Sequence, residues 1–202
     1  MQGYKLFTHL YSNTVKKSFN KLSIDSYYNI KRYRAFSLVD TNNYSLIGNP
    51  LFMQNANYNN YLGNKVRYYP NIHLDVIQDK SFQRTLNTFK HTISTYNKQY
   101  TKFYIHQIRV ITDTSDINVV PEGIHQDGYD YICISCVNKY SINPIYNEIY
   151  DKMYNMVDTI ELNENDNLIL NDLNYYHNVT NLSSSNKKFT GYRDIFVFTT
   201  FS

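Results

Sequence analysis

The period of the hydrophobic pattern changes near residue 100, and this change limits the folds open to the chain. Beyond that point apolar and polar residues alternate, which is the period of two expected of β-strands. Turns rich in Asn, Asp and Ser separate the alternating runs, with no helical signal between them. Five runs carry the pattern: FYIHQIRVI, YDYICISCV, PIYNEIYD, DNLILND and RDIFVFTTF. The pattern of the second half therefore predicts that these strands form an antiparallel sandwich, a jelly roll or a small barrel.

The first hundred residues carry weaker signals. Residues 33–69 are rich in turns, and short apolar runs such as AFSLV indicate strands or irregular cover. Before them, four apolar residues have spacings that predict one or two helices packed on the core: Leu6, Leu10, Phe19 and Leu22. We expect residues 1–100 to form a helical and irregular cover over a jelly-roll core of residues 101–202.

A clearer helix is predicted over residues 81–99, SFQRTLNTFKHTISTYNKQ. Ser81 is a suitable N-cap, because its hydroxyl can accept a hydrogen bond from a free backbone N–H of the first turn. Apolar residues recur every three or four positions and form one stripe: Phe82, Leu86, Phe89 and Ile93. Such a helix would cover one face of a sheet.

Length and charge limit the class of protein. A chain of 202 residues is long enough for one well-buried core, so we expect a single domain, residues 1–202. The net charge is only +3 and no long block of Lys and Arg occurs, which argues against nucleic-acid binding despite 22 Tyr. No apolar stretch has the length of a membrane span, and no signal core opens the chain, so we expect a cytoplasmic protein without membrane contact.

The two cysteines form a C-x-x-C, a pattern that can indicate redox chemistry or half of a zinc site. Cys133 and Cys136 lie, however, in the predicted strand YDYICISCV. Residues three apart on a strand point to opposite faces and cannot converge on one metal ion. We therefore interpret them as ordinary buried thiols.

A candidate metal site lies just before the same strand. His125 and Asp127 are two residues apart in extended backbone, so their side chains point the same way, roughly 6.5–7 Å apart. His177, after the run DNLILND, supplies a third ligand from elsewhere in the fold. Two His and one carboxylate on one face leave positions open, as non-haem Fe(II) oxygenases require. The alternative is a hydrogen-bonded structural histidine in each place, the first of them in a surface turn.

Arg193 opens the last predicted strand. In alternation it shares a face with the apolar residues Ile195 and Val197 and with Thr199, so it points into the barrel if they do. A buried guanidinium group requires an anion, and its fork fits the C5 carboxylate of 2-oxoglutarate. Asp194 points the other way and is no partner on that face. The alternative is a structural salt bridge with another acidic residue.

At these residues the chain resembles the 2OG-Fe dioxygenase family related to bacterial L-isoleucine hydroxylases. The resemblance rests on three segments: PEGIHQDGYDYICISCV, DNLILNDLNYYHNVT and GYRDIFVFTTF. They match the pattern P-x-G-x-H-x-D-G, then D-x-x-x-x-H-x-V-T, then G-x-R-D. The upstream segments YNIKRYRAFSL, FMQNANYNNYLGNKVRYY and HQIRV extend the similarity to residues 27–202.

The resemblance implies a mainly β double-stranded β-helix, a jelly-roll or cupin-like fold with N-terminal and flanking helices. It implies that Fe(II), 2-oxoglutarate and O₂ are used, with His125, Asp127 and His177 as iron ligands and Arg193 as the cosubstrate anchor. The reaction implied is hydroxylation of a small molecule, and we favour a free L-amino acid. One departure affects the substrate: Asn143-Pro144 stands where the family has a Gly-Gly turn.

Substrate contacts are assigned less directly. Tyr129 and Tyr131 share a face with the metal ligands if no bulge intervenes, so both can line the cavity or simply pack in the core. Arg109 is a candidate for a substrate carboxylate, although an ion pair is the favoured role. The rival functions are hydroxylation of a protein side chain, a jelly-roll module that binds metal or ligand without turnover, and a basic Tyr-rich protein that binds nucleic acid or a scaffold.

Overall fold

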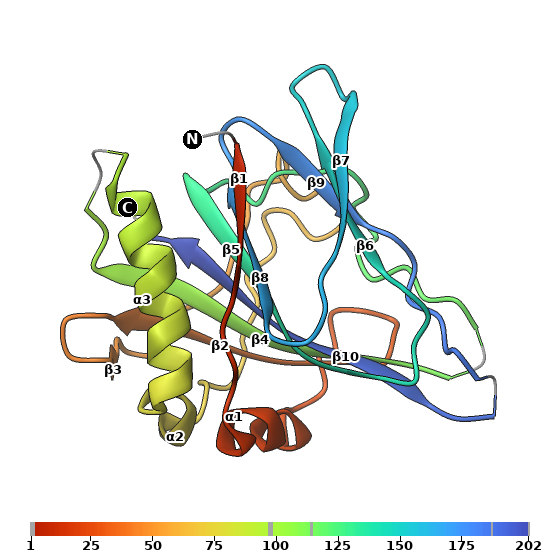
Figure 1. Cartoon of the computed structure of the whole chain (residues 1–202), viewed down its shortest axis with the longest axis horizontal. Coiled ribbons are helices and arrows are strands. Elements are labelled where there is room, and N and C mark those ends of the chain that lie inside the picture. The colour runs from red at the N-terminus through yellow and green to blue at the C-terminus, as the bar shows by residue number, and fades with distance from the viewer. Residues whose placement is uncertain (1–2, 97–98, 114, 187, 202) are drawn as a thin grey trace.

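The computed structural model describes residues 3–96, 99–113, 115–186 and 188–201. Two antiparallel sheets are the main feature (Figure 1), and together they confirm the predicted mainly β jelly-roll class. The larger sheet has the strand order β1-β8-β5-β10-β4-β2-β3, and the smaller one the order β7-β6-β9. The strands are β1 (Tyr4–Thr8), β2 (Arg32–Asp40), β3 (Ser45–Leu46), β4 (Lys102–Thr112), β5 (Tyr131–Tyr140), β6 (Tyr146–Tyr150), β7 (Met156–Glu161), β8 (Asp166–Asn171), β9 (Tyr176–Val179) and β10 (Gly191–Thr200). The helices are α1 (Asn13–Ser18), the 3-10 turn η1 (Phe19–Lys21), α2 (Leu74–Ile77) and α3 (Lys80–Ser94).

All five alternating runs of the second half form strands, namely β4, β5, β6, β8 and β10. The sequence analysis missed β7 and β9. Most of β7 is exposed, so it has little apolar signal, and β9 is only four residues long. Short strands such as these are held by backbone pairing with β6 and leave almost no period in the sequence.

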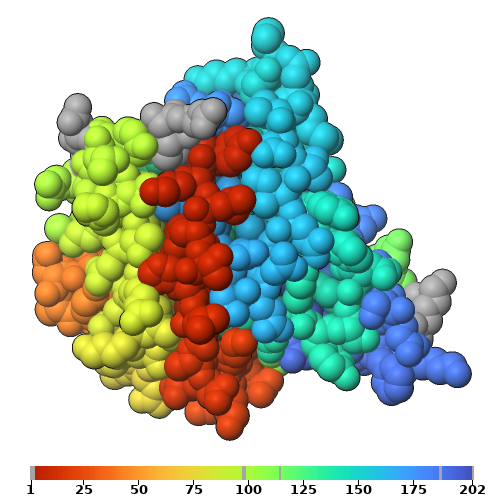
Figure 2. All heavy atoms as spheres, in the orientation of Figure 1, coloured from red at the N-terminus to blue at the C-terminus, as the bar shows by residue number. Residues whose placement is uncertain are grey.

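The first hundred residues do more than cover the core, because β1, β2 and β3 belong to the larger sheet. The prediction of one or two N-terminal helices is confirmed for residues 13–21, where α1 and η1 lie and Phe19 is buried, but it is wrong for Leu6 and Leu10. Leu6 is 50% exposed and Leu10 75% exposed, since β1 joins the sheet edge through its backbone rather than through an apolar face. Figure 2 shows this red segment on the surface between α3 and the blue strands of the second half.

Helix α3 carries the predicted apolar stripe, and all four residues of the stripe are fully buried. The N-cap is Asp79 instead of Ser81: the Asp79 carboxylate accepts a hydrogen bond of 2.8 Å from the backbone N–H of Ser81. The helix ends at Ser94, short of the predicted Gln99, and residues 97–98 lie outside the described part of the chain.

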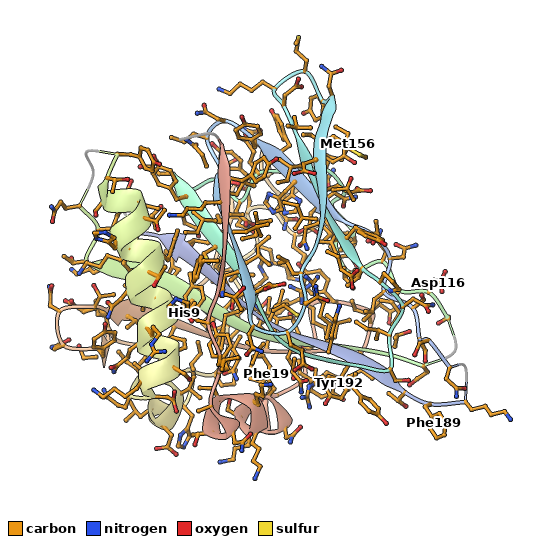
Figure 3. The ribbon with its side chains drawn as sticks, in the orientation of Figure 1. His9, Phe19, Asp116, Met156, Phe189 and Tyr192 are labelled. Carbon is orange, nitrogen blue, oxygen red and sulfur yellow. The ribbon has the colours of Figure 1, made fainter. Side chains whose placement is uncertain are left out.

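The outer face of the larger sheet packs against the helices. Phe82 of α3 and Phe19 of η1 both contact Phe196 of β10, with ring centroids 5.2 Å apart in each case. Figure 3 labels Phe19 close to α1, beside the sheet. None of the helices in the described ranges has the length and apolar character that crossing a membrane demands.

A second core lies between the two sheets and contains Ile134 and Cys136 of β5 and Ile149 of β6. Cys133 belongs instead to the core under the helices. The two cysteines therefore lie on opposite faces of β5 as free thiols, which confirms the strand interpretation. The inner face of the larger sheet, beyond this second core, forms one wall of the cavity described next.

Candidate metal centre and its cavity

His125 and His177 are brought together by their backbones. His125 N donates to the His177 carbonyl oxygen at 3.0 Å, and His177 N donates to the His125 carbonyl oxygen at 2.8 Å. This antiparallel bridge extends the edge of β9, and it brings the two imidazole rings to a centroid distance of 4.3 Å. The His125 side chain is 9% exposed and His177 6%, so both rings are shielded from bulk water.

The Asp127 carboxylate lies between the two rings. One of its oxygens is 3.7 Å from Nε2 of His125, and the other is 3.7 Å from Nε2 of His177. One ligand atom from each of the three residues lies within 4.8 Å of the others, and in the described residues this is the one such cluster of His, Cys, Asp and Glu.

The arrangement fits a divalent ion. First-row ions such as zinc bind N and O ligands at roughly 2.0–2.2 Å, so ligand atoms at right angles would lie roughly 3 Å apart, a small contraction from the distances seen. Three such ligands on one face leave the opposite face open to a cosubstrate. The donor set of two imidazoles and one carboxylate suits non-haem Fe(II).

A neighbouring carbonyl group fixes the orientation of His125, whereas the group near Nδ1 of His177 lies beyond hydrogen-bond distance. Nδ1 of His125 donates to the Gly123 carbonyl oxygen at 2.8 Å, which leaves Nε2 as the nitrogen that an ion would bind. Gly123 has a φ of +73°, a conformation that costs glycine little. Nδ1 of His177 lies 3.8 Å from the buried Asp172 carboxylate.

Asp172 also holds the turn that follows the first two ligands. Its carboxylate accepts hydrogen bonds from the backbone N–H groups of Asp127, Gly128 and Tyr129, at 3.1, 2.8 and 3.1 Å. Burial raises the pKa of Asp172 to about 7, and the charge of Asp127 adds to the effect. Sequence reasoning missed Asp172, although it is the Asp of the D-x-x-x-x-H motif that ends at His177.

Gln54 supports the carboxylate of Asp127 from the loop before α2. Its side-chain amide donates to an Asp127 carboxylate oxygen at 3.2 Å. Its own oxygen accepts from Arg67 at 3.1 Å and from Asn59 at 3.2 Å, so the amide orientation is fixed from both ends. Gln54 was also missed as a site residue; the only signal was its place in FMQNANYNNYLGNKVRYY, one of the segments that carry the resemblance.

Titration of the cluster follows from burial and the shared carboxylate. Burial lowers the pKa of His125, but the adjacent Asp127 outweighs it and raises the pKa to about 9. Burial, together with the charge of His125, lowers the pKa of His177 to about 3. Burial opposes ionisation of Asp127, yet the two imidazoles hold its pKa below the usual range. Near neutral pH both ring nitrogens of His125 therefore carry a proton, and a cation that binds Nε2 must displace the proton on that nitrogen.

Arg193 lines the same cavity as the three candidate ligands. Ile195, Val197 and Thr199 line it too, so the predicted inward face of β10 is confirmed. Arg193 is only 5% exposed, and its Nε and one terminal nitrogen have no hydrogen-bond partner. In the part of the chain that the structure describes, no acidic side chain forms an ion pair with it, which disfavours the structural salt bridge.

Arg109 lies away from the cavity. Its guanidinium group forms two hydrogen bonds of 2.6 Å with the carboxylate of Asp194, which points to the outer face of β10, and it stacks on Tyr192 at 4.3 Å. The geometry gives Arg109 the ion pair that the sequence analysis favoured and removes it from the candidate substrate contacts.

The two candidate tyrosines separate. Tyr129 lines the cavity, whereas Tyr131 packs against the core under the helices and stacks on Tyr96 with centroids 6.2 Å apart. The expectation that both share a face with the ligands is therefore wrong for Tyr131. The physical reason is that residues 128–130 form a bend and β5 begins only at Tyr131, so strand alternation does not extend from Tyr129 to Tyr131.

The departure Asn143-Pro144 lies before β6, outside the residues that line the cavity. The Asn143 side chain donates to the Ser183 hydroxyl at 2.9 Å and to the Ser184 carbonyl oxygen at 3.3 Å. These hydrogen bonds connect the turn to residues 183–184. The replacement of the Gly-Gly turn therefore acts directly on this pair of loops and not on the lining of the cavity.

Comparison with known proteins matches residues 16–199 to the family described as 2OG-Fe dioxygenase. Among solved structures, a bsmA homolog from Methylobium petroleophilum PM1 has a TM-score of 0.76 at 19% identity, over 93% of this chain and 79% of that one. IDO from Bacillus thuringiensis has a TM-score of 0.74 at 16% identity, over 98% and 90%. The Fe(II)/(alpha)ketoglutarate-dependent dioxygenase TqaL has a TM-score of 0.65 at 15% identity, over 93% and 73%. Identities this low show a shared fold, and no curated protein matches the chain.

Proposed function

We propose that this chain, which belongs to the 2OG-Fe dioxygenase family, hydroxylates a small molecule. The favoured substrate is a free L-amino acid. We further propose that the chain is related to the bacterial L-isoleucine hydroxylases of that family and that residues 1–202 act as a single domain. The family uses Fe(II), 2-oxoglutarate and O₂.

His125, Asp127 and His177 would hold the iron. The observation that carries this assignment is the joining of the two histidines by reciprocal backbone hydrogen bonds, with the Asp127 carboxylate 3.7 Å from each Nε2. A merely structural histidine pair has no need of a carboxylate shared between both Nε2 atoms. The hydrogen bond of Gln54 supports the role by holding that carboxylate in place.

Arg193 would anchor the C5 carboxylate of 2-oxoglutarate. Its buried guanidinium group has free donors that point into the cavity of the candidate ligands, and a carboxylate could accept two parallel hydrogen bonds there. When bound, Fe(II) and 2-oxoglutarate supply the oxidising power: O₂ is consumed, the cosubstrate is decarboxylated to succinate and CO₂, and the substrate gains a hydroxyl group.

The remaining walls of the cavity would position ligands and exclude water. Ile134, Ile195 and Val197 present apolar side chains beside Arg193. Their low polarity strengthens the pairing of the guanidinium group with a carboxylate, since fewer waters compete for it. Tyr129, which also lines the cavity, adds a phenol that burial keeps protonated by raising its pKa.

The test is anaerobic reconstitution with Fe(II), followed by a screen for succinate release over the standard L-amino acids in air. The expected result is iron bound in a ratio of one per chain and succinate formed together with one hydroxylated amino acid. Protein that binds no iron, or binds iron but not 2-oxoglutarate, would contradict the proposal. A jelly-roll binding module would bind one or both and release no succinate with any substrate.

A further inference from the structure

Two arginines of β2 face the same cavity as Arg193 but lie two strands away from it. Arg32 is opposite Val110 of β4, and Val110 is opposite Arg193 of β10. Because neighbouring strands are about 4.8 Å apart, the backbones of Arg32 and Arg193 are separated by about 10 Å. Ile108 and Val110 form an apolar strip between the two cationic regions. Each region is therefore placed to meet a different anion.

Arg34 has the least satisfied charge in the region formed by β2. It is only 4% exposed, and its Nε has no hydrogen-bond partner. One terminal nitrogen is 2.6 Å from Nδ1 of His106, a ring that burial and three nearby arginines keep neutral by lowering its pKa. The carboxylate of Asp25 is 4.0 Å away and lies closer to Arg32, at 3.5 Å. A buried cation with so little compensation requires another anion.

The surrounding charges leave a positive surplus. Arg67 is fully buried against Phe52, the same ring that Arg34 contacts from 4.8 Å, and its Nε and one terminal nitrogen have no partner. Three guanidinium groups, Arg32, Arg34 and Arg67, thus share two carboxylates, Asp25 and Glu122. The charge of Asp127 is not free to balance them once it binds a cation. The surplus favours a negatively charged group of a ligand beside Arg34, whose Nε has no hydrogen-bond partner.

Glu122 offers the complementary group. One of its carboxylate oxygens is buried without a hydrogen-bond partner, and the other receives only a long contact of 3.5 Å from Asn59. It lines the cavity shared by Arg34 and the candidate iron ligands. A buried carboxylate oxygen needs a donor, and a cationic donor is the strongest. The same chamber therefore contains an unpaired donor for an anion and an unpaired acceptor for a cation.

We propose that Arg34 binds the carboxylate of the substrate and that Glu122 binds its ammonium group. The inference rests on the proposed function and deepens it, because it selects a zwitterion: a small molecule with a free carboxylate and a free ammonium group. A residue inside a polypeptide has neither charge at its α-carbon, so this pair disfavours a protein side chain as the substrate. The aliphatic part of the zwitterion would lie against Phe52 and Val119, which line the same cavity.

Binding measurements test this without turnover. The protein loaded with Fe(II) and 2-oxoglutarate is titrated anaerobically with the standard L-amino acids. The best ligand is then compared with the amine that lacks its carboxylate and with its N-acetyl derivative, which lacks the ammonium group. Removal of either charge should weaken binding by at least about 30-fold, as expected when one partner of a buried charge pair is lost.

The variants separate the two subsites. Arg34→Gln should weaken the amino acid by about 30-fold or more, with the affinity for 2-oxoglutarate changed by less than about threefold. Glu122→Gln, at a less buried position, should weaken the amino acid but not its N-acetyl derivative. Arg84→Gln, which changes an exposed arginine of α3, is the matched control and should alter neither ligand.

The outcomes distinguish this inference from the proposed function. Wild-type protein that binds neither iron nor 2-oxoglutarate would overturn both. Wild-type protein that binds both, with Arg34→Gln losing 2-oxoglutarate and keeping the amino acid, would overturn the inference and move the cosubstrate anchor from Arg193 to β2, but it would leave the dioxygenase function standing. Binding of no amino acid, or binding of the amine and the N-acetyl derivative as tight as that of the amino acid itself, would also overturn it. If Arg34→Gln does not fold, Glu122→Gln alone decides, and loss of its discrimination against the N-acetyl derivative is the supporting result.

Discussion

Replacement of Arg193 by Met tests whether the buried guanidinium group serves a ligand or the fold. Arg193 is 5% exposed and forms no ion pair within the described residues, while two of its donors have no partner. Met has a similar length without the charge, so Arg193→Met should leave the melting temperature of the protein unchanged or raise it. Loss of a bidentate pair in a desolvated pocket costs about 2–5 kcal/mol, which is roughly 30- to several-thousand-fold in 2-oxoglutarate affinity.

The assay is anaerobic calorimetric titration of 2-oxoglutarate into protein loaded with Fe(II), with iron content measured on the same samples. Arg193→Lys should have an intermediate affinity, because an ammonium group keeps the charge but not the fork. Arg109→Met is the matched control. It should keep the affinity for 2-oxoglutarate and lose about 3–5 kcal/mol of folding stability, because Asp194 is left buried without its partner. Wild-type 2-oxoglutarate affinity in Arg193→Met would refute the reasoning.

Four further predictions follow from the same structure. His125→Ala, Asp127→Ala and His177→Ala should each lose bound iron and turnover but retain their circular dichroism spectrum; undiminished iron by elemental analysis in all three would contradict the ligand assignment. Cys133→Ser and Cys136→Ser should keep full iron content and change only the melting temperature, since the thiols lie on opposite faces of β5. The pKa of His125 is raised to about 9, so its proton must leave when a cation binds, and the affinity for Fe(II) should fall about tenfold for each pH unit below that value. Calorimetry in buffers of different ionisation enthalpy should detect about one proton released per ion at pH 7. Binding without proton release would contradict this prediction. Phe89→Ala should cost about 3–5 kcal/mol in chemical denaturation, because the ring is fully buried between α3 and the sheet, whereas exposed Thr95→Ala should cost little.

Long central strands could be predicted from the sequence because their runs of β-branched and aromatic residues leave a strong pattern. β4 and β10 are of this kind. β1 could not, since an edge strand is recruited by backbone hydrogen bonds and Leu6 is half exposed. Asp79 displaced Ser81 as the helix cap because either residue type can accept the hydrogen bond, and only the path of the chain decides which does.

The candidate site divides in the same way. The i, i+2 spacing of His125 and Asp127 predicts a shared direction, and the structure brings their ligand atoms together with that of His177. The partnership with His177 depends on a bridge between distant segments, for which only the family resemblance gave a signal. Arg32 and Arg34 were missed, although alternation on β2 places both on the face that Phe36 shares.

The central position of β10 has a consequence for the order in which the protein can mature. β10 follows every other described strand in the chain, yet it pairs with β5 on one side and with β4 on the other. During synthesis from the N-terminus, the larger sheet must remain split into two halves with open edges until residues 191–200 have left the ribosome. Such edges invite wrong pairing with other chains, so the nascent protein should depend on chaperones at this stage. Because Arg193 is part of β10, the pairing of that strand closes the sheet and completes the cavity in the same folding step.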